Sequence, residues 1–233
     1  MQSQQAGRDA NAEDDTVDAR ADEGADDGAK SPHAADGASP ARKRPKPGER
    51  RVQILQTLAA MLEEPGADRI TTAALAAKLS VSEAALYRHF ASKAQMFEGL
   101  IEFIEQSIFT LINQITERDA DPALQARRIV FMLLQFGEKN PGMARVMVGD
   151  ALVFENERLS ARMNQFFDKI ESQLRQSLRA AAEQAGSQTP TVDANGRASA
   201  LTALAVGRLQ RFTRSGFKRS PTEQIEMALG LLT

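Results

Sequence analysis

Residues 70–93, ITTAALAAKLSVSEAALYRHFASK, contain the signals for two short helices in close succession. Thr71 or Thr72 offers a hydroxyl that can cap a short helix, and Ser82 offers the same to a second helix that begins at the next residue. About three residues separate the two helices. Two short capped helices at this spacing predict a helix-turn-helix.

Helical spacing divides this segment into an inner and an outer face. The outer face of the second helix carries Ala84, Tyr87 and Arg88, which are related by steps of three and four residues. A helix with such a face fits the major groove of DNA, which is about 12 Å wide, and its first residues reach base edges. The positions expected to face inward are Leu75, Ala76, Leu79, Val81, Ala85, Leu86 and Phe90.

The outer side chains are suited to the two kinds of contact that a DNA-binding helix makes, with base edges and with phosphates. Glu83 can accept a hydrogen bond from a cytosine amine, and Ala84 can contact a thymine methyl group. Tyr87 and His89 come later on the helix, where they can donate to phosphate oxygens and fix the register. A lone Tyr and His on a short helix are also typical of half-buried packing residues. The candidate DNA-binding residues are Thr71, Thr72, Ser82, Glu83, Ala84, Tyr87, Arg88, His89 and Lys93.

Outward from this segment, amphipathic helical periodicity continues to the end of the chain, without strand alternation of useful length and without repeats. We therefore predict an all-α fold of about nine helices. Residues 48–93 would form the helix-turn-helix head, and residues 94–233 a helical body for dimerisation and partner binding. The expected helices cover 48–62, 72–79, 83–90, 93 to the RDADPA segment, 123–139, 143–153, 155–184, 196–218 and 221–231.

The first 47 residues have a different character. Residues 1–41 carry ten acidic residues against three basic ones and almost no large apolar side chains, so we expect a disordered acidic tail. The rest of the 233-residue chain has 26 basic residues against 21 acidic ones. The tail ends in a basic arm next to the head, where it could contact phosphates or the minor groove or be a solvated linker. The arm consists of Arg42, Lys43, Arg44 and Lys46.

Composition excludes several classes of protein. The tail has no apolar region typical of a signal peptide, and no apolar run is long enough to cross a bilayer, so we expect no membrane span and a cytoplasmic protein. The chain has no Cys and only two His, which excludes disulfides and His-pair metal sites, and no phosphate-binding G-x-x-x-x-G-K loop is present. We therefore expect no enzyme, no metal and no cofactor.

Residues 70–105, ITTAALAAKLSVSEAALYRHFASKAQMFEGLIEFIE, resemble the DNA-binding domain of the TetR family, whose motif is similar to L-A-x-x-x-G-V-S-x-x-x-L-Y-x-x-F-x-x-K. Ser80 departs from this pattern, because it stands where the family usually has glycine in the turn. A left-handed Ser80 costs about 1 kcal/mol relative to Gly, which is tolerable. The resemblance implies contacts between double-stranded DNA and the head.

The TetR resemblance also implies a homodimer in which the last two long helices of each subunit pack as a four-helix bundle. Such a dimer, with two reading heads, would bind a pseudo-palindromic site. Two long apolar stripes agree with this arrangement, although either stripe could be satisfied within one subunit. The expected interface residues are Leu159, Met163, Phe166, Ile170, Leu174, Leu204 and Phe212.

Later segments, among them FGEKNPG, ALVFENERL and RFTRSGFKRSPT, resemble the nucleoid occlusion factors, a branch of the TetR regulators. The resemblance implies a nucleoid-associated protein that binds the C-terminal tail of the division protein FtsZ. The tail would dock between the helix that starts at Lys93 and the helix that ends at GEKNPG. The residues implied for this groove are Phe103 as an apolar floor, Met132 as a wall, and Lys139 and Asn140 as polar contacts.

Two features of this groove stay open at the level of sequence. Leu111 stands where relatives have a basic residue, which weakens the electrostatic part of the groove. Phe103 and Met132 could equally be core residues, and Lys139 could be a solvated helix end. The alternative function is a TetR-type repressor controlled by a small-molecule ligand; a helical adaptor that binds only protein would show no DNA binding.

Overall fold

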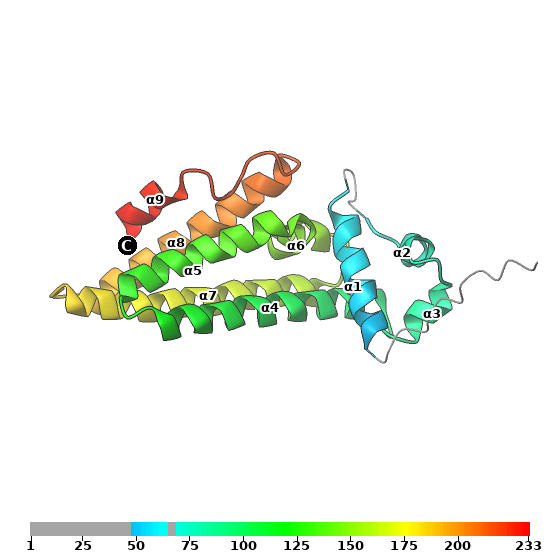
Figure 1. Cartoon of the computed structure of the whole chain (residues 1–233), viewed down its shortest axis with the longest axis horizontal. Helices are drawn as coiled ribbons and strands as arrows, with labels where there is room; N and C mark the ends of the chain where they lie inside the picture. Colours follow the sequence, from blue (N-terminus) through cyan, green and yellow to red (C-terminus); the bar gives the residue numbers. More distant parts are fainter. Residues whose placement is uncertain (1–47, 65–68) are drawn as a thin grey trace, which may run out of the picture. The chain divides into compact units, whose positions relative to one another are not determined.

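The structure is a computed structural model that describes residues 48–64 and 69–233. This part of the chain contains nine α-helices and one 3-10 helix and no strands, which confirms the all-α prediction (Figure 1). The expected acidic tail and basic arm lie outside the described residues. The helices are α1 (Glu49–Leu62), α2 (Thr72–Lys78), α3 (Glu83–Tyr87), α4 (Lys93–Arg118), α5 (Pro122–Lys139), α6 (Pro141–Met147), η1 (Asp150–Leu152), α7 (Glu157–Gln184), α8 (Pro190–Arg214) and α9 (Ile225–Leu232).

The head consists of α1, α2 and α3, and side-chain caps set its two short helices. The Thr71 hydroxyl accepts a hydrogen bond from Ala74 N at 3.1 Å, and the Ser82 hydroxyl accepts one from Ala85 N at 3.3 Å. Between the two helices, Ser80 has a φ of 54°, the left-handed conformation expected where the family uses glycine. The predicted turn is therefore present with serine in it.

The head is fixed to the body by a close approach of two helices. A Cβ on Gly142 in α6 would lie 2.0 Å from the carbonyl oxygen of Ala59 in α1, so only glycine fits there. Nearby, Arg145 Nη1 donates a hydrogen bond to the carbonyl oxygen of Leu62 at 3.2 Å. These contacts hold the last turns of α1 against the start of α6.

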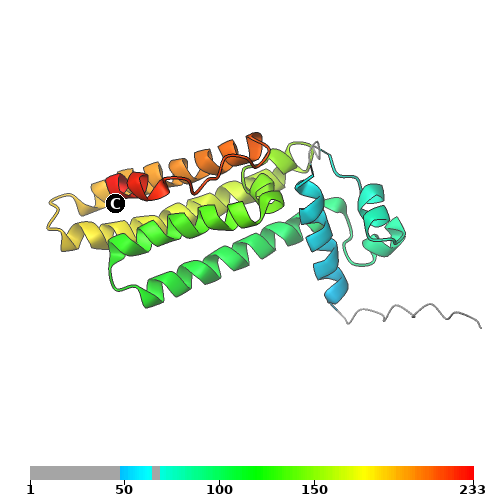
Figure 2. The ribbon, with the colours of Figure 1, turned by 45° about the horizontal axis from the view of Figure 1, so that its top comes forward.

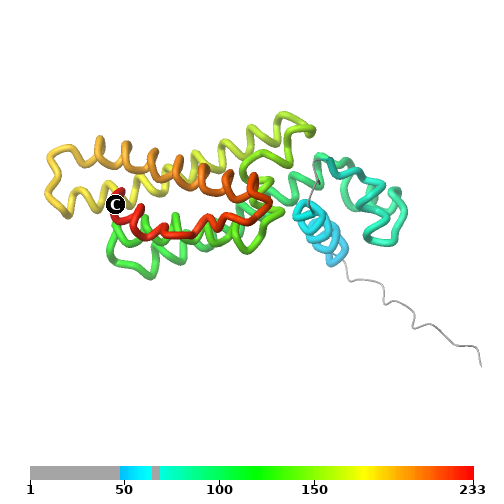
Figure 3. Tube along the Cα trace, turned by 90° about the horizontal axis from the view of Figure 1, so that it is seen from above, coloured from blue at the N-terminus to red at the C-terminus, as the bar shows by residue number. Residues whose placement is uncertain are grey.

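The body is built from the long helices α4, α5, α7 and α8, with α9 lying on α5 and α8. The hairpin of α7 and α8 is seen side by side in Figures 2 and 3, and α5 packs against both of its helices. Phe166 contributes edge-to-face contacts with Phe109 from α4 and Phe167, with centroids 5.8 Å and 5.1 Å apart. None of the helices in residues 48–64 and 69–233 is long and apolar enough to cross a membrane.

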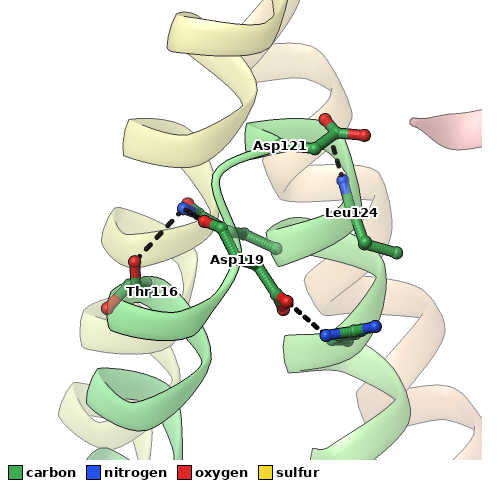
Figure 4. Close-up of polar contacts among 6 residues, drawn as sticks. Thr116, Asp119, Asp121 and Leu124 are labelled. Carbon is green, nitrogen blue, oxygen red and sulfur yellow. Dashed lines mark hydrogen bonds and ion pairs between the residues drawn. The ribbon is translucent and has the colours of Figure 1, made fainter.

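The turn between α4 and α5 sets these two helices antiparallel and is closed by polar contacts (Figure 4). Asp121 Oδ1 caps α5 by accepting from the backbone N–H groups of Ala123 at 2.9 Å and Leu124 at 3.4 Å. Asp119 pairs with Arg128 one turn further along α5. Pro122, at the first position of the helix, has the fixed φ that a helix start requires.

Several predicted helix boundaries were wrong. The last long helix begins at Pro190 rather than residue 196, because proline is favoured at a first helical position and Thr189 precedes it as the N-cap residue. That helix ends at Arg214 because Gly216 and Phe217 adopt left-handed conformations. The helix predicted over 143–153 is α6 followed by η1, separated by Gly149 with a φ of 84°. The second helix of the helix-turn-helix ends at residue 87, not 90.

The predicted dimer interface was wrong for six of its seven residues. Each of the six has at most 3% of its surface exposed within a single subunit, so no area is left to bury against a partner. The two stripes on α7 and α8 instead face each other and the rest of the body, because both helices pack against α5 as well as against each other. Leu204 keeps a partly exposed side chain. The six buried residues are Leu159, Met163, Phe166, Ile170, Leu174 and Phe212.

Candidate nucleic-acid interface

The outer face of α3 is exposed as its spacing predicts. Ala84 and Arg88 are exposed and Tyr87 keeps 45% of its surface accessible, while Leu86 and Phe90 are buried against the rest of the head. Tyr87 is therefore about half-buried, so its exposed part can contact DNA while its buried part packs on the head, and both interpretations of Tyr87 stay open. The helix is only five residues long, so its exposed side chains all lie within about one and a half turns.

Hydrogen bonds fix the residues at the start of this face. The Thr72 hydroxyl donates to Glu83 Oε2 at 2.5 Å, so Thr72 orients the carboxylate that was expected to read a base. The hydroxyl oxygens of Thr71 and Ser82 accept from backbone N–H groups, which leaves their O–H hydrogens to donate to phosphate. Thr72 thus orients Glu83, while Thr71 and Ser82 keep O–H donors at the edge of the face.

Two arginines of α1 belong to the same region, and the sequence reasoning missed them. Arg50 lines a hollow of about 350 Å³ together with Arg88 and His89 of the α3 end. Arg51 Nη1 donates to the carbonyl oxygen of His89 at 2.6 Å, and its guanidinium lies 4.0 Å from the centre of the Phe90 ring. Their position directly after the basic arm could have indicated that Arg50 and Arg51 lie near the DNA.

Lys93, which was expected to contact a DNA phosphate, is paired with a carboxylate of the body. Its ammonium group forms an ion pair with Glu155 Oε1, which lies in the segment before α7, and its side chain is 24% exposed. The ammonium also lies 5.7 Å from the centre of the Phe97 ring. Lys93 as a phosphate contact therefore stays a prediction, and the structure adds a competitor for its charge.

The four residues implied for a peptide groove come from the two helices on either side of the α4–α5 seam: Phe103 lies on α4, Met132 and Lys139 lie on α5, and Asn140 is the C-cap of α5. Phe103 is 49% exposed, so its core interpretation was wrong, while Met132 is half-buried and Lys139 exposed. Asn140 Nδ2 donates to the carbonyl oxygen of Phe136 at 2.8 Å, which leaves its amide oxygen as the free polar group. At a rise of about 1.5 Å per residue, Phe103 and Lys139 lie roughly 22 Å and 26 Å from the α4–α5 turn, and Met132 about 15 Å from it.

Only one of these four residues borders the hollows of this seam. Met132 lines an open hollow of about 450 Å³ with Arg127, Phe131 and Gln135, and a neighbouring one of about 220 Å³ with Leu111. Phe103, Lys139 and Asn140 line neither. Arg118 from α4 and Arg128 from α5 line the smaller hollow together with Leu111, and Arg128 is paired there with Asp119. Sequence reasoning missed both arginines because they read as a solvated helix face.

Metal ligation has no support in this region. The described residues contain no group of three or more His, Asp or Glu side chains that could hold a metal ion.

Two segments of the chain match models of known protein families. Residues 54–100 match the model of bacterial regulatory proteins of the tetR family, and residues 121–233 match the SlmA-like form of the tetracyclin repressor-like C-terminal domain. The chain is 51% identical to the nucleoid occlusion factor SlmA of Vibrio vulnificus (strain YJ016) over 189 residues, which cover 81% of this chain and 96% of the relative. The chain belongs to the SlmA family of nucleoid occlusion factors. The SlmA of Salmonella typhi is 52% identical over 178 residues, covering 76% of this chain and 89% of that one.

Solved structures show that the SlmA-family chain has the fold of TetR regulators. The transcriptional regulator FadR from Bacillus subtilis, solved in complex with stearoyl-CoA, superposes with a TM-score of 0.63 at 14% identity, covering 78% of this chain and 96% of that one. The TetR-family transcriptional regulator PfmR from Thermus thermophilus gives a TM-score of 0.62 at 22% identity, covering 78% and 94%. At these identities the likeness concerns the fold alone. The relatives that define the family are nucleoid occlusion factors and regulatory proteins, not enzymes, in agreement with the sequence prediction.

Proposed function

We propose that this protein is a sequence-specific DNA-binding homodimer that acts as a nucleoid occlusion factor, binding FtsZ and blocking assembly of the division ring over the chromosome. The observation that carries the proposal is the 51% identity to an SlmA over nearly its whole length, through both head and body. In this account the protein works on the nucleoid, in the cytoplasm.

In the first step, α3 enters the major groove of a pseudo-palindromic site. Glu83, oriented by Thr72, and Ala84 reach base edges, while Tyr87, Arg88 and His89 contact phosphates. Arg50 adds a cation beside Arg88 and His89. The basic arm, Arg42, Lys43, Arg44 and Lys46, follows the backbone or minor groove next to α1.

The dimer uses the outer face of α8, in place of the buried stripes predicted from sequence. Gly196, Ala200, Ala203 and Gly207 recur at helical spacing; the first three are exposed and Gly207 is partly exposed. A Cβ on Gly196 or Gly207 would meet open space, so nothing in the subunit covers this side of the helix. Small residues allow the helices of two subunits to approach closely, and Leu204 lies beside them.

In the second step, the acidic and apolar FtsZ tail docks along α4 and α5. Phe103 offers an exposed ring at the end of the seam near the head, and Lys139, at about the same level, offers a cation. Further along, Met132 and Leu111 border the hollows next to Arg127 and Arg128. An extended peptide with carboxylates on one side and apolar residues on the other fits this order of groups.

The experiment that tests the proposal measures fluorescence anisotropy of a labelled FtsZ C-terminal tail peptide titrated with the dimer, with and without a palindromic duplex. We expect saturable binding that Lys139→Glu weakens at least tenfold. Lys169→Glu, which makes the same charge change on the exposed side of α7, is the matched control and should leave the affinity unchanged. Sedimentation shows whether each variant is still a dimer.

Binding of the duplex without binding of the tail would contradict the proposal and favour a ligand-controlled repressor. Release of the duplex by a small molecule would then identify the ligand.

A further inference from the structure

Three ion pairs of the described residues join α4 to the segment that begins α7. Lys93 pairs with Glu155, Arg158 Nη2 lies 2.6 Å from Glu98, and Arg162 holds Glu105 through both Nε and Nη2. The hydrogen bond from Arg162 to Glu105 raises the pKa of Arg162, against a lowering by burial, so this arginine stays charged. The pairs form a row along the two helices, from the head outward.

The pair nearest the head differs from the other two in direction. At Glu98 and Glu105 the acid lies on α4 and the base on α7, whereas at Lys93 the base lies on α4. Lys93 is the first residue of α4, so the carboxylate of Glu155 also lies at the positive end of that helix. The Glu155 side chain is only 9% exposed, so solvent screens its charge little.

The negative charge that pairs with Lys93 comes from a segment of the body. Glu155 belongs to the short connection between η1 and α7, and its backbone N–H donates to the carbonyl oxygen of Leu152 at 3.0 Å. The two residues before it, Val153 and Phe154, are 70% and 66% exposed. The carboxylate that holds Lys93 is thus attached to an exposed surface loop of the body.

We propose that Glu155 competes with a DNA phosphate for Lys93, so that this body loop lowers the DNA affinity of the head. A lysine paired with a carboxylate carries no net charge toward the duplex and displaces no counterion from it. When DNA binds, its phosphate must either draw the ammonium of Lys93 away from Glu155 or share the ammonium with Glu155. By reciprocity, DNA binding frees the loop that carries Glu155, which couples the head to the body.

This inference rests on the proposed function, because it requires that Lys93 contact a phosphate. The test is a double-mutant cycle of Glu155→Gln and Lys93→Gln, with the affinity for the specific duplex measured over a range of salt concentrations. Glu155→Gln should raise the affinity about fivefold and steepen the dependence of log K on log salt by up to about 0.9 for each head. Lys93→Gln should make the salt dependence shallower. In the Lys93→Gln background, Glu155→Gln should change neither the affinity nor the salt dependence.

Glu105→Gln is the matched control, since it removes an α4–α7 ion pair further from the head and should leave the salt slope unchanged. Glu155→Ala should act like Glu155→Gln, and thermal unfolding of each variant identifies any that fails to fold.

Three results would overturn the inference. The first is weaker duplex binding by Glu155→Gln, which would mean that Glu155 positions Lys93. The second is an unchanged slope, and the third is an equal effect of Glu155→Gln with and without Lys93. In each of these the wild-type protein still binds the duplex, whereas a failure of the proposed function would appear as no specific binding by the wild type.

Discussion

Replacing Gly142 with alanine tests whether the contact of α1 with α6 holds the head on the body. The new Cβ would lie 2.0 Å from the carbonyl oxygen of Ala59, 2.9 Å from its carbon and 3.2 Å from Glu63 Cγ. Favourable carbon contacts are about 3.5–4.0 Å long, so the two helices must separate by more than about 1 Å. The nearest atoms are backbone, which cannot turn aside as a side chain can.

The expected loss of stability follows from two opposing effects. Overpacking of a close contact costs about 1–3 kcal/mol and occasionally more, and alanine regains at most about 1 kcal/mol of helix propensity over glycine. We expect Gly142→Ala to lower the free energy of unfolding by about 2 kcal/mol. For a chain of this size that is a fall in Tm of roughly 4–8 °C.

Urea and thermal unfolding followed by circular dichroism measure this change. Gly230→Ala in α9 is the matched control, because a Cβ there meets open space and should leave the protein as stable or up to about 1 kcal/mol more stable. If Gly142→Ala unfolds at the same urea concentration as Gly230→Ala, the close contact of α1 and α6 does not exist in solution.

Three further predictions concern the turn, one carboxylate and the dimer. Ser80→Gly should raise the free energy of unfolding by up to about 1 kcal/mol in urea titrations, because Ser80 has a φ of 54°; a loss would contradict this. The Ser187 hydroxyl, then Thr189 and Arg197, lower the pKa of Asp193, so its contribution to stability is present above the unfolded pKa of about 3.9 and lost as pH falls through the lower folded pKa. Asp193→Asn should therefore shift the urea midpoint at neutral pH and not in strong acid; equal shifts at both would refute this. Ala203→Glu, on the outer face of α8, should yield monomers in sedimentation, and an intact dimer would place the interface elsewhere.

Local features of the head could be predicted from sequence because they depend on neighbouring residues. A hydroxyl directly before a helix finds its backbone N–H partner within three residues, as at Thr71, Ser82 and Ser92. The burial of Leu75 and Leu86 follows from helical spacing in the same way. The start of α8 at Pro190 was missed because a segment rich in Gly, Ser, Thr and Pro reads as a loop, although proline is favoured at the first position of a helix.

Features that depend on the packing of distant residues could not be predicted. An apolar stripe indicates that a helix face is buried, but not whether its own subunit or a second copy covers it, and Phe166 is covered by its own. Lys93 and Glu155 are 62 residues apart, and only the packing of α4 against α7 brings them together. Arg50 was passed over because an arginine near a basic arm reads as part of a solvated linker.

If the DNA-bound dimer blocks FtsZ assembly, the effect should appear with purified proteins. The most direct measurement follows polymerisation of purified FtsZ with GTP by light scattering, with the protein present alone, with a palindromic duplex that it binds, and with Lys139→Glu in place of the wild type. We expect the wild-type protein on its duplex to lower the scattering and the variant on the same duplex to leave it unchanged. Unchanged polymerisation with the wild type bound to its duplex would mean that this protein does not block FtsZ assembly.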